Sequence, residues 1–458
     1  MAGDNNIILN PQDYSLDYCK VITSVGLPYD FRHAIMEFNY FEDLYSNYIS
    51  GSILVNDAVG FLSNMSFNGH EYIILGFSKP DDETSKIEKT FRIFKVDNRH
   101  MLNDQNENYL LHFCSEENVL SEQKKVSKSY KNKKVSDIVI DIVMNQLGTA
   151  NTKFLATNCE ETQGTRDIII PNFKPFEAIN WLCTQAISNS SQTKGSPYLF
   201  YENYFGYNFK SLQSLYDGQI YGNFKYEPKN LTMPDDARVQ DLSSEKTNVL
   251  TYEPISNFDS LNMINSGAYA NRIITIDPLR MRYDIKDFDY KKYFGSAKKL
   301  NDHGLLSNTE NRFGQSANTA YDSVLKVVTT NTGETTYNPY IKAHQPDIKD
   351  INIETTVPLR TAQIAHINAI RYKISIPGDP KMTVGNIITF SVPELTRTVD
   401  GKNEDVYNSG KYLVTAVRHR LDVENKFITI LEISKDSVLS PYVDPNNALP
   451  AWKELRSK

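Results

Sequence analysis

The chain has 458 residues, a formal net charge of −7 and an aromatic content of 11%, with 28 Tyr and 22 Phe. A single hydrophobic core rarely grows beyond about 250–300 residues, so this length predicts several domains. The many aromatic and β-branched residues favour sheets over helical bundles. The acidic balance excludes a general electrostatic attraction to nucleic acid or to an anionic membrane surface.

The cysteines and the N-terminus indicate a reducing compartment. The four cysteines are far apart and form no Cys-x-x-Cys pair, so we interpret them as reduced packing residues. The first residues have neither the basic region nor the apolar core of a signal peptide, and the chain contains no run of about 18 apolar residues. We therefore expect synthesis in a cytoplasm and no membrane insertion.

Residues 1–121 are predicted to form a first β module. Alternating apolar residues between polar turns predict its strands, at residues 32–40, 49–55, 71–77, 90–101 and 109–115. The last two strands form a long hairpin, since an Asn-rich stretch at 103–108 provides the turn.

Residues 122–247 are predicted to form an α+β middle domain. They begin with a lysine-rich stretch, residues 122–134, which we interpret as a solvated linker because it lacks the interleaved aromatics of single-strand nucleic-acid binders. Apolar residues at helical spacing then predict one helix over 135–147 and another that starts at Pro175. Strands follow the second helix, at residues 198–201 and 207–212.

The remaining residues are divided into four segments. Strands at 272–277 and 280–285 place residues 248–290 in a second β module, which resumes at 351–440 after a polar insertion or arm at 291–350. Within 351–440 we expect a helix at 359–370, strands at 373–376 and 387–392, and a hairpin joining 411–421 to 427–433. Residues 441–458 form a proline-containing tail.

The two β regions contain similar elements in the same order along the chain. Residues 114–121 and 433–440 both end in Val-Leu-Ser and both follow the second strand of a long hairpin. A Gly-led strand (69–77 and 385–392) precedes each hairpin, and a short helical stretch (57–65 and 359–370) precedes that strand. We interpret this as a duplication, the alternative being two unrelated modules with similar hairpins. A trimer of such a subunit would form a ring with pseudo-sixfold symmetry.

Two sets of motifs carry a resemblance to a known family. One is Val-Gly-Asn-Ile-Ile at 384–388, followed by Ser-Gly-Lys-Tyr-Leu-Val at 409–414 and Val-Arg-His at 417–419. The other is the helix start at 175–182 with the aromatic strand at 198–202. In order and spacing these motifs resemble the baseplate hub proteins of contractile-tailed phages, which are related to the late control protein D family and to the base of the type VI secretion spike.

The resemblance implies a mainly β homotrimer with an α+β middle domain and two tube-like antiparallel β-barrel modules per subunit. Such a ring adapts a sixfold tail tube to a threefold central spike in the baseplate of the virion. The implied partners are the central spike protein, the tail tube or tube-initiator protein, the tape-measure protein and the baseplate wedge proteins. DNA only passes through the lumen, and no cofactor or metal is implied.

Seven residues are predicted to lie at interfaces between subunits or partners. Two should fix the middle domain, four should lie in the ring, and an aromatic residue in the tail should act as an anchor, because large aromatics are enriched at such contacts. The two residues of the middle domain are Phe176 and Trp181. The four residues of the ring are Tyr412, Val414, Arg418 and His419, and the aromatic residue of the tail is Trp452.

No catalytic motif is present. Gly-x-Gly-x-x-Gly, phosphate-loop, Gly-x-Ser-x-Gly and His-Glu-x-x-His patterns are absent, and no two histidines lie two to four residues apart. The carboxylates Asp284, Asp287 and Asp289 lack the Gly and Glu of a calcium loop and are interpreted as a solvated edge. We therefore expect no enzyme activity. The alternatives are another trimeric virion component, such as a receptor-binding or wedge protein, and a cell-wall hydrolase, which a coupled carboxylate pair in a cleft would reveal.

Overall fold

A computed structural model of the chain describes residues 12–64, 67–79, 82–103, 106–149, 154, 158–189, 195–226, 246–257, 259–278, 281–295, 297–305, 321, 324–329, 353–394, 404–422 and 426–441. Strands in mostly antiparallel sheets dominate these residues, which confirms the predicted mainly β character. Within the same ranges, no helix is both long enough and apolar enough to cross a membrane.

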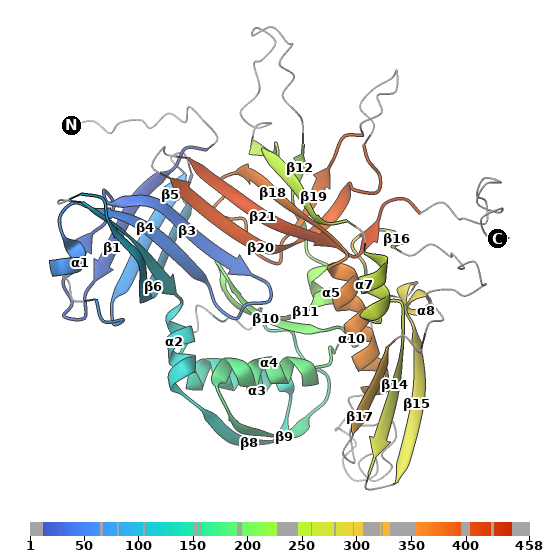
Figure 1. Ribbon diagram of the computed structural model, residues 1–458. Coiled ribbons are helices and arrows are strands. Elements are labelled where there is room, and N and C mark those ends of the chain that lie inside the picture. Colours follow the sequence, from blue (N-terminus) through green and yellow to red (C-terminus); the bar gives the residue numbers. More distant parts are fainter. Residues whose placement is uncertain are drawn as a thin grey trace.

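One 13-stranded sheet runs through both β regions of the chain. The N-terminal module contributes β1 (Ser15–Ile22), β2 (Pro28–Asp30), β3 (Ile35–Asp43), β4 (Ser50–Asp57), β5 (Tyr72–Lys79), β6 (Asp82–Met101) and β7 (Glu107–Cys114). The C-terminal module contributes β12 (Ile220–Lys225), β13 (Thr251–Ser256), β18 (Ile370–Pro377), β19 (Ile387–Ser391), β20 (Gly410–Asp422) and β21 (Phe427–Lys435). Figure 1 shows the two modules side by side, with β3 and β4 of the first in blue and β20 and β21 of the second in red.

The two modules have the same strand order. In the N-terminal module the order is β3-β4-β7-β6-β5-β1, and in the C-terminal module it is β13-β18-β21-β20-β19-β12. Taken in chain order, the corresponding strands also appear in the same sequence. One difference is that β12 runs parallel to β19, whereas β1 runs antiparallel to β5. The described strands of each module form an open series and not a closed barrel ladder.

The correspondence extends to irregular details. The β6–β7 ladder has a register shift between Ile93 and Lys95, and the β20–β21 ladder has one between Val414 and Ala416. The amide of Ile93 donates to the Glu71 carbonyl at 3.0 Å, and that of Val414 to the Asn386 carbonyl at 2.9 Å. A bulge at the same place in two ladders is a specific feature that general hairpin rules do not require.

A glycine with positive φ precedes the equivalent strands β5 and β19. Gly69 has φ +83° and Gly385 has φ +87°, a conformation that side chains with a Cβ rarely adopt. At Gly385 a Cβ would also lie 2.7 Å from the Tyr201 hydroxyl. The Gly-led strands noticed in the sequence therefore have a conformational reason in both modules.

The predicted helices of the repeat, by contrast, are not equivalent. In the N-terminal module α1 (Phe61–Asn64) lies between β4 and β5, but α10 (Ile353–Ile367) precedes β18 in the C-terminal module. The match of 57–65 with 359–370 is thus wrong, because the repeated unit is the strand series. α10 belongs instead to an insertion between β13 and β18, where the N-terminal module has only a short turn.

The insertion forms its own small sheet. It contains α7 (Ser260–Asn265), β14 (Ala270–Asp277), β15 (Arg282–Asp289), α8 (Tyr290–Phe294), β16 (His303–Gly304), β17 (Leu325–Thr329) and α10. β14 pairs with β15 and β17, away from the large sheet, so the assignment of 248–290 to the second module is wrong for β14 and β15.

The segment 291–350, predicted to be a polar insertion or arm, is only partly described. Its described strands contact the rest of the chain: β16 pairs with β22 (Ser437–Val438) and β17 with β14. These parts are not a free arm.

The middle domain lies below the two modules in Figure 1. It consists of α2 (Glu116–Gln123), β8 (Val126–Lys133), α3 (Val135–Asp141), the π-helix η1 (Ile142–Gln146), β9 (Arg166–Phe173), α4 (Pro175–Gln185), β10 (Tyr198–Asn203), β11 (Gly206–Ser211) and α5 (Leu212–Leu215). The lysine-rich stretch is strand β8 paired with β9, so its interpretation as a linker is wrong. Buried Val126 and Tyr130 anchor this strand while its lysines are exposed.

Candidate assembly interface

The two modules are joined edge to edge through β3 and β20. Residues 410–413 of β20 pair with β19, and residues 416–422 then pair with β3 along the same edge. β21 occupies the opposite edge of β20. β20 therefore belongs to its own module in its first half and connects to the other module in its second half.

Aromatic and apolar side chains fill the inner face of this junction. Phe38 and Tyr40 of β3 and His419 and Leu421 of β20 are all buried. Nδ1 of His419 lies 3.0 Å from the Thr429 hydroxyl oxygen. Burial lowers the pKa of His419 to about 3, so the imidazole is neutral at ordinary pH.

Charged side chains cross the outer face of the junction. Arg418 donates from Nε to Asn39 Oδ1 at 2.8 Å and from a terminal nitrogen to Glu37 at 3.2 Å. Arg420 donates to the other oxygen of Glu37 at 3.1 Å. The Arg418 guanidinium also lies 5.6 Å from the centre of the Phe41 ring. These groups are partly exposed, so each ion pair contributes roughly 1 kcal/mol or less.

Two buried carboxylates connect the parts of the subunit. Glu42 accepts hydrogen bonds from the Tyr40 hydroxyl at 2.8 Å and the Val384 amide at 3.1 Å. Burial raises the pKa of Glu42 to about 7. Glu202, from β10, accepts from the Ile49 amide at 3.1 Å and so connects the middle domain to the N-terminal module. Both carboxylates are engaged with backbone amides.

The predicted interface residues lie in three places. Arg418 and His419 come together at the junction, whereas Tyr412 and Val414 are buried in the core of the C-terminal module. Phe176 and Trp181 pack within the middle domain, where the Trp181 ring lies 6.0 Å from that of Phe173. Trp452 is outside the described residues. Contacts of these residues with another subunit stay a prediction, but Tyr412 and Val414 have almost no surface with which to make them.

Sequence reasoning missed two open strand edges. β5 pairs with β6 only as far as Arg92, and among the described strands none pairs with the remainder of that edge, residues 93–101. β13 pairs with β18 on one edge, and its other edge has no described partner strand. Pro254 within β13 is a signal that could have indicated an edge strand, because proline is confined to edges and bulges.

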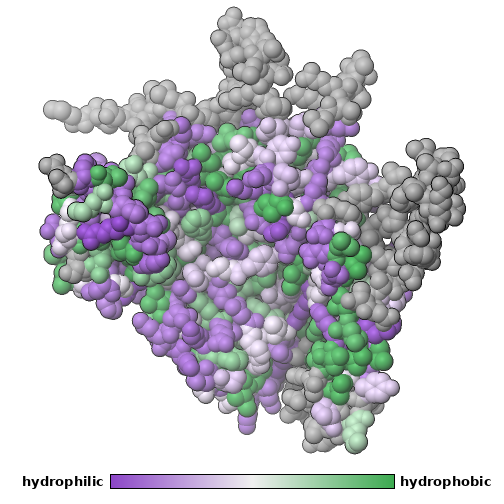
Figure 2. Space-filling model, viewed as in Figure 1, coloured by the Kyte–Doolittle hydropathy of each residue, from purple (hydrophilic) through white to green (hydrophobic). Residues whose placement is uncertain are grey.

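The sheet of the insertion has an exposed apolar face. α10 covers one face through Ile273 and Val357, and Figure 2 shows apolar side chains over this region on the lower right. The exposed members are Ile276, Tyr283, Ile285, Leu325 and Val327. Apolar faces of this kind mark interaction sites, although no contact in the structure indicates what covers this one.

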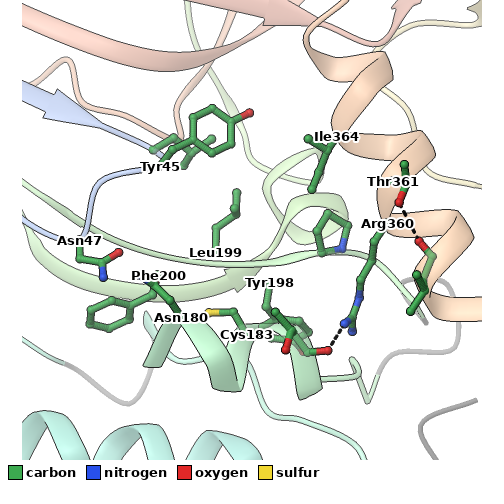
Figure 3. A pocket seen from close by; sticks show the side chains of 14 residues that line it. Tyr45, Asn47, Asn180, Cys183, Tyr198, Leu199, Phe200, Arg360, Thr361 and Ile364 are labelled. Carbon is green, nitrogen blue, oxygen red and sulfur yellow. Dashed lines mark hydrogen bonds between the residues drawn. The ribbon is translucent and has the colours of Figure 1, made fainter. Parts of the chain in front are cut away.

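A cavity of about 430 Å³ lies between α4, β10 and α10 (Figure 3). Its lining is mainly apolar, and its charged residue, Arg360, donates hydrogen bonds to the carbonyls of Thr184 and Ala186 at the C-terminal end of α4. Because the guanidinium is already engaged in capping that helix, we interpret the cavity as a packing gap between domains. The described part of the chain has no group of three or more His, Cys, Asp or Glu that could hold a metal ion.

Comparison of the whole structure defines the class of fold, that of phage tail proteins. Two tail proteins are among the solved structures that share it. The tail protein from Neisseria meningitidis MC58 aligns with a TM-score of 0.51 at 9% identity, over 93% of this chain and 97% of that one. The 43 kDa tail protein of prophage MuSo2 from Shewanella oneidensis aligns with a TM-score of 0.50 at 8% identity, over 92% and 99%.

The resemblance indicated by the sequence motifs is thus confirmed at the level of the fold. No protein-family model matches the chain, and no curated protein matches it in sequence.

Proposed function

We propose that this chain is a non-enzymatic structural subunit of a phage tail baseplate, the central hub. Three copies form a ring in which six equivalent β modules surround a lumen, so that a sixfold tail tube is joined to a threefold central spike. The observation that carries this proposal is the shared strand order of the two modules, together with the bulge that recurs at Ile93 and Val414.

The duplication explains why three subunits would suffice. A contact that joins one edge of a module to a different edge of the next module generates a closed ring when the rotation between neighbouring modules closes on itself. The β3–β20 junction is one such contact inside a single chain. If a similar contact forms between chains, three subunits supply six modules.

A tube-like shape of each module has support in the backbone hydrogen bonds. Ahead of β3, the amide of Phe31 donates to the Cys19 carbonyl of β1 at 2.8 Å. Ahead of β13, the amide of Val249 donates to the Lys225 carbonyl of β12 at 2.8 Å. The first and last strands of each series therefore approach one another at one end, as the strands of a narrow tube do.

The partners follow from this position in the virion. The hub would contact the central spike, the tail tube or tube-initiator protein, the tape-measure protein and the wedge proteins, and DNA would pass through the lumen during ejection. A net charge of −7 suits passage better than retention, because phosphate contacts by basic side chains would hold the DNA. Synthesis would take place in the host cytoplasm.

The test is the mass and shape of the purified full-length protein. Light scattering should give three times the chain mass of 52.3 kDa, and negative-stain class averages should show a threefold ring with a central hole. Compact monomers at tens of micromolar would contradict the hub. A trimer without a hole would favour another virion component, and clearing of a peptidoglycan gel would favour a hydrolase.

A further inference from the structure

We propose that neighbouring subunits are joined by a β ladder between the open edge of β13 in one copy and the open edge of β6 in the next, in the register that β3 and β20 use within the chain. This inference rests on the proposed ring and specifies its contact between subunits. The argument depends on which positions of the two modules are equivalent.

The equivalence of β6 with β20 comes from their common neighbours, β7 and β21. Val96 of β6 pairs with Leu111, and Val417 of β20 pairs with Leu431, one position beyond the shared bulge in each case. Toward the end of the two hairpins, Met101 pairs with Glu107 and Leu421 with Phe427. Met101 therefore occupies in the N-terminal module the place that Leu421 has in the C-terminal module.

The equivalence of β3 with β13 follows in the same way through β4 and β18. Ile53 of β4 pairs with Leu111 of β7, and Ile374 of β18 pairs with Leu431 of β21. Phe38 of β3 pairs with Ile53, and Tyr252 of β13 pairs with Ile374. Tyr252 is therefore the counterpart of Phe38.

Phe38 and Leu421 are directly paired across the junction inside the chain. Their counterparts, Tyr252 and Met101, should be paired across the boundary between subunits. The exposures agree: Phe38 is 1% and Leu421 2% exposed, whereas Tyr252 is 37% and Met101 76% exposed. Equivalent positions are thus covered where a partner strand is present and uncovered where none is.

Other exposed apolar side chains lie along the same two edges. Phe94 and Leu102 are exposed on or next to β6, and Ile255 is exposed on β13. A strand edge with unpaired backbone groups and apolar side chains tends to recruit another strand. Two such edges on one subunit, equivalent to two that already pair, fit a second copy of this chain as the partner.

The polar residues are also compatible with this ladder. Arg420 pairs with Asn39 at the internal junction, and their counterparts, His100 and Glu253, would face one another between subunits. Pro254 takes the place of Tyr40 and has no N–H, so the ladder loses at most one hydrogen bond there. β6 has a further register shift between Asp97 and His100, so the two kinds of junction are similar but not identical.

The experiment is disulfide trapping in the full-length protein with Met101→Cys and Tyr252→Cys combined. Directly opposed residues in an antiparallel ladder bring their Cβ atoms close enough for a disulfide. Mild oxidation should convert most of the protein to a covalent trimer on a non-reducing gel, reversed by reductant. Each single variant should give no covalent trimer.

The matched control combines Met101→Cys with Glu253→Cys, since adjacent side chains of a strand point to opposite faces and this pair should remain uncrosslinked. Light scattering on the same samples separates the two ideas. If the double variant Met101→Cys, Tyr252→Cys is a trimer but forms no cross-link, the β6–β13 ladder is wrong although the ring stands. The same conclusion follows if the control pair cross-links equally well. Monomers at tens of micromolar would overturn both.

Discussion

The imidazole of His419 in the C-terminal module lies 5.6 Å, centroid to centroid, from the ring of Tyr40 in the N-terminal module. The two residues are also opposite one another in the β3–β20 ladder. The Arg-His motif that supported the resemblance in the sequence is therefore located where the two modules meet, with Arg418 on the outer face and His419 buried.

Replacement of Tyr40 should destabilise the junction in two measurable steps. Tyr40→Phe removes only the hydroxyl that donates to Glu42 and should lower the free energy of unfolding by roughly 1–2 kcal/mol. Tyr40→Ala also leaves a cavity and should cost roughly 3–5 kcal/mol. Chemical denaturation measures both, with the exposed Tyr283→Ala as control. Equal effects of the two Tyr40 variants would contradict the packing role of the ring.

Glu42 should make stability depend on pH in a definite direction. Its pKa is about 7 in the folded chain, against 4.5 for an ordinary glutamate, because burial disfavours the charged carboxylate. The unfolded chain thus releases this proton at lower pH, so the contribution of Glu42 to stability falls as pH rises from about 4.5 to about 7.

Glu42→Gln mimics the protonated form of the side chain and keeps an acceptor for the Val384 amide. The variant should therefore be more stable than the parent by up to about 3 kcal/mol at pH 8 and should differ little from it near pH 4. Thermal melts at the two pH values measure the difference. The exposed Glu122→Gln serves as control. A variant that is less stable than the parent at pH 8 would show that the charged form is the one stabilised by the fold.

Charges on the open edges should prevent assembly without unfolding the subunit. Phe94→Lys and Ile255→Lys change exposed side chains on β6 and β13, so the melting temperature of the subunit should change little. Each variant should place an unpaired lysine at the contact between two subunits. The dissociation constant of the trimer should therefore rise at least tenfold. Sedimentation at several concentrations measures this shift, with the exposed Val25→Lys as control. Trimers of unchanged affinity would argue against these edges as the contact.

Arg360→Met should loosen the connection between the insertion and the middle domain. The variant keeps the apolar stem but removes the hydrogen bonds to the carbonyls of Thr184 and Ala186. The Ala186 carbonyl is partly buried and would lose this donor, whereas the Thr184 carbonyl is exposed to water, so we expect a loss of roughly 1–2 kcal/mol. Hydrogen exchange should become faster in α10 and at the end of α4, while β18 to β21 keep their protection. Faster exchange across the whole chain would indicate general unfolding instead. Arg371→Met, which removes a half-exposed ion pair with Glu432, is the matched control.

Local patterns in the sequence predicted most elements well, for physical reasons. The helix that starts at Pro175 has a fixed φ at its first residue and an apolar face, and the structure places α4 at Pro175–Gln185. The last hairpin has two runs rich in β-branched and apolar residues around a polar turn at 422–426, and it appears as β20 and β21. The lysine-rich stretch was misread because only Val126 and Tyr130 of β8 are buried, which is too few for a recognisable alternation.

The sequence by itself determined the mainly β composition, the hairpins, and the repeated Gly-led strand and hairpin that point to two modules. Only the tertiary structure decided which strand edges are covered. Arg418 and Asn39 are 379 residues apart, yet their hydrogen bond belongs to the ladder that joins the modules. Pairing along a strand edge uses backbone N–H and C=O groups that every residue but proline carries. Side-chain patterns therefore reveal the faces of a strand, whereas its partners depend on where the fold brings its edges.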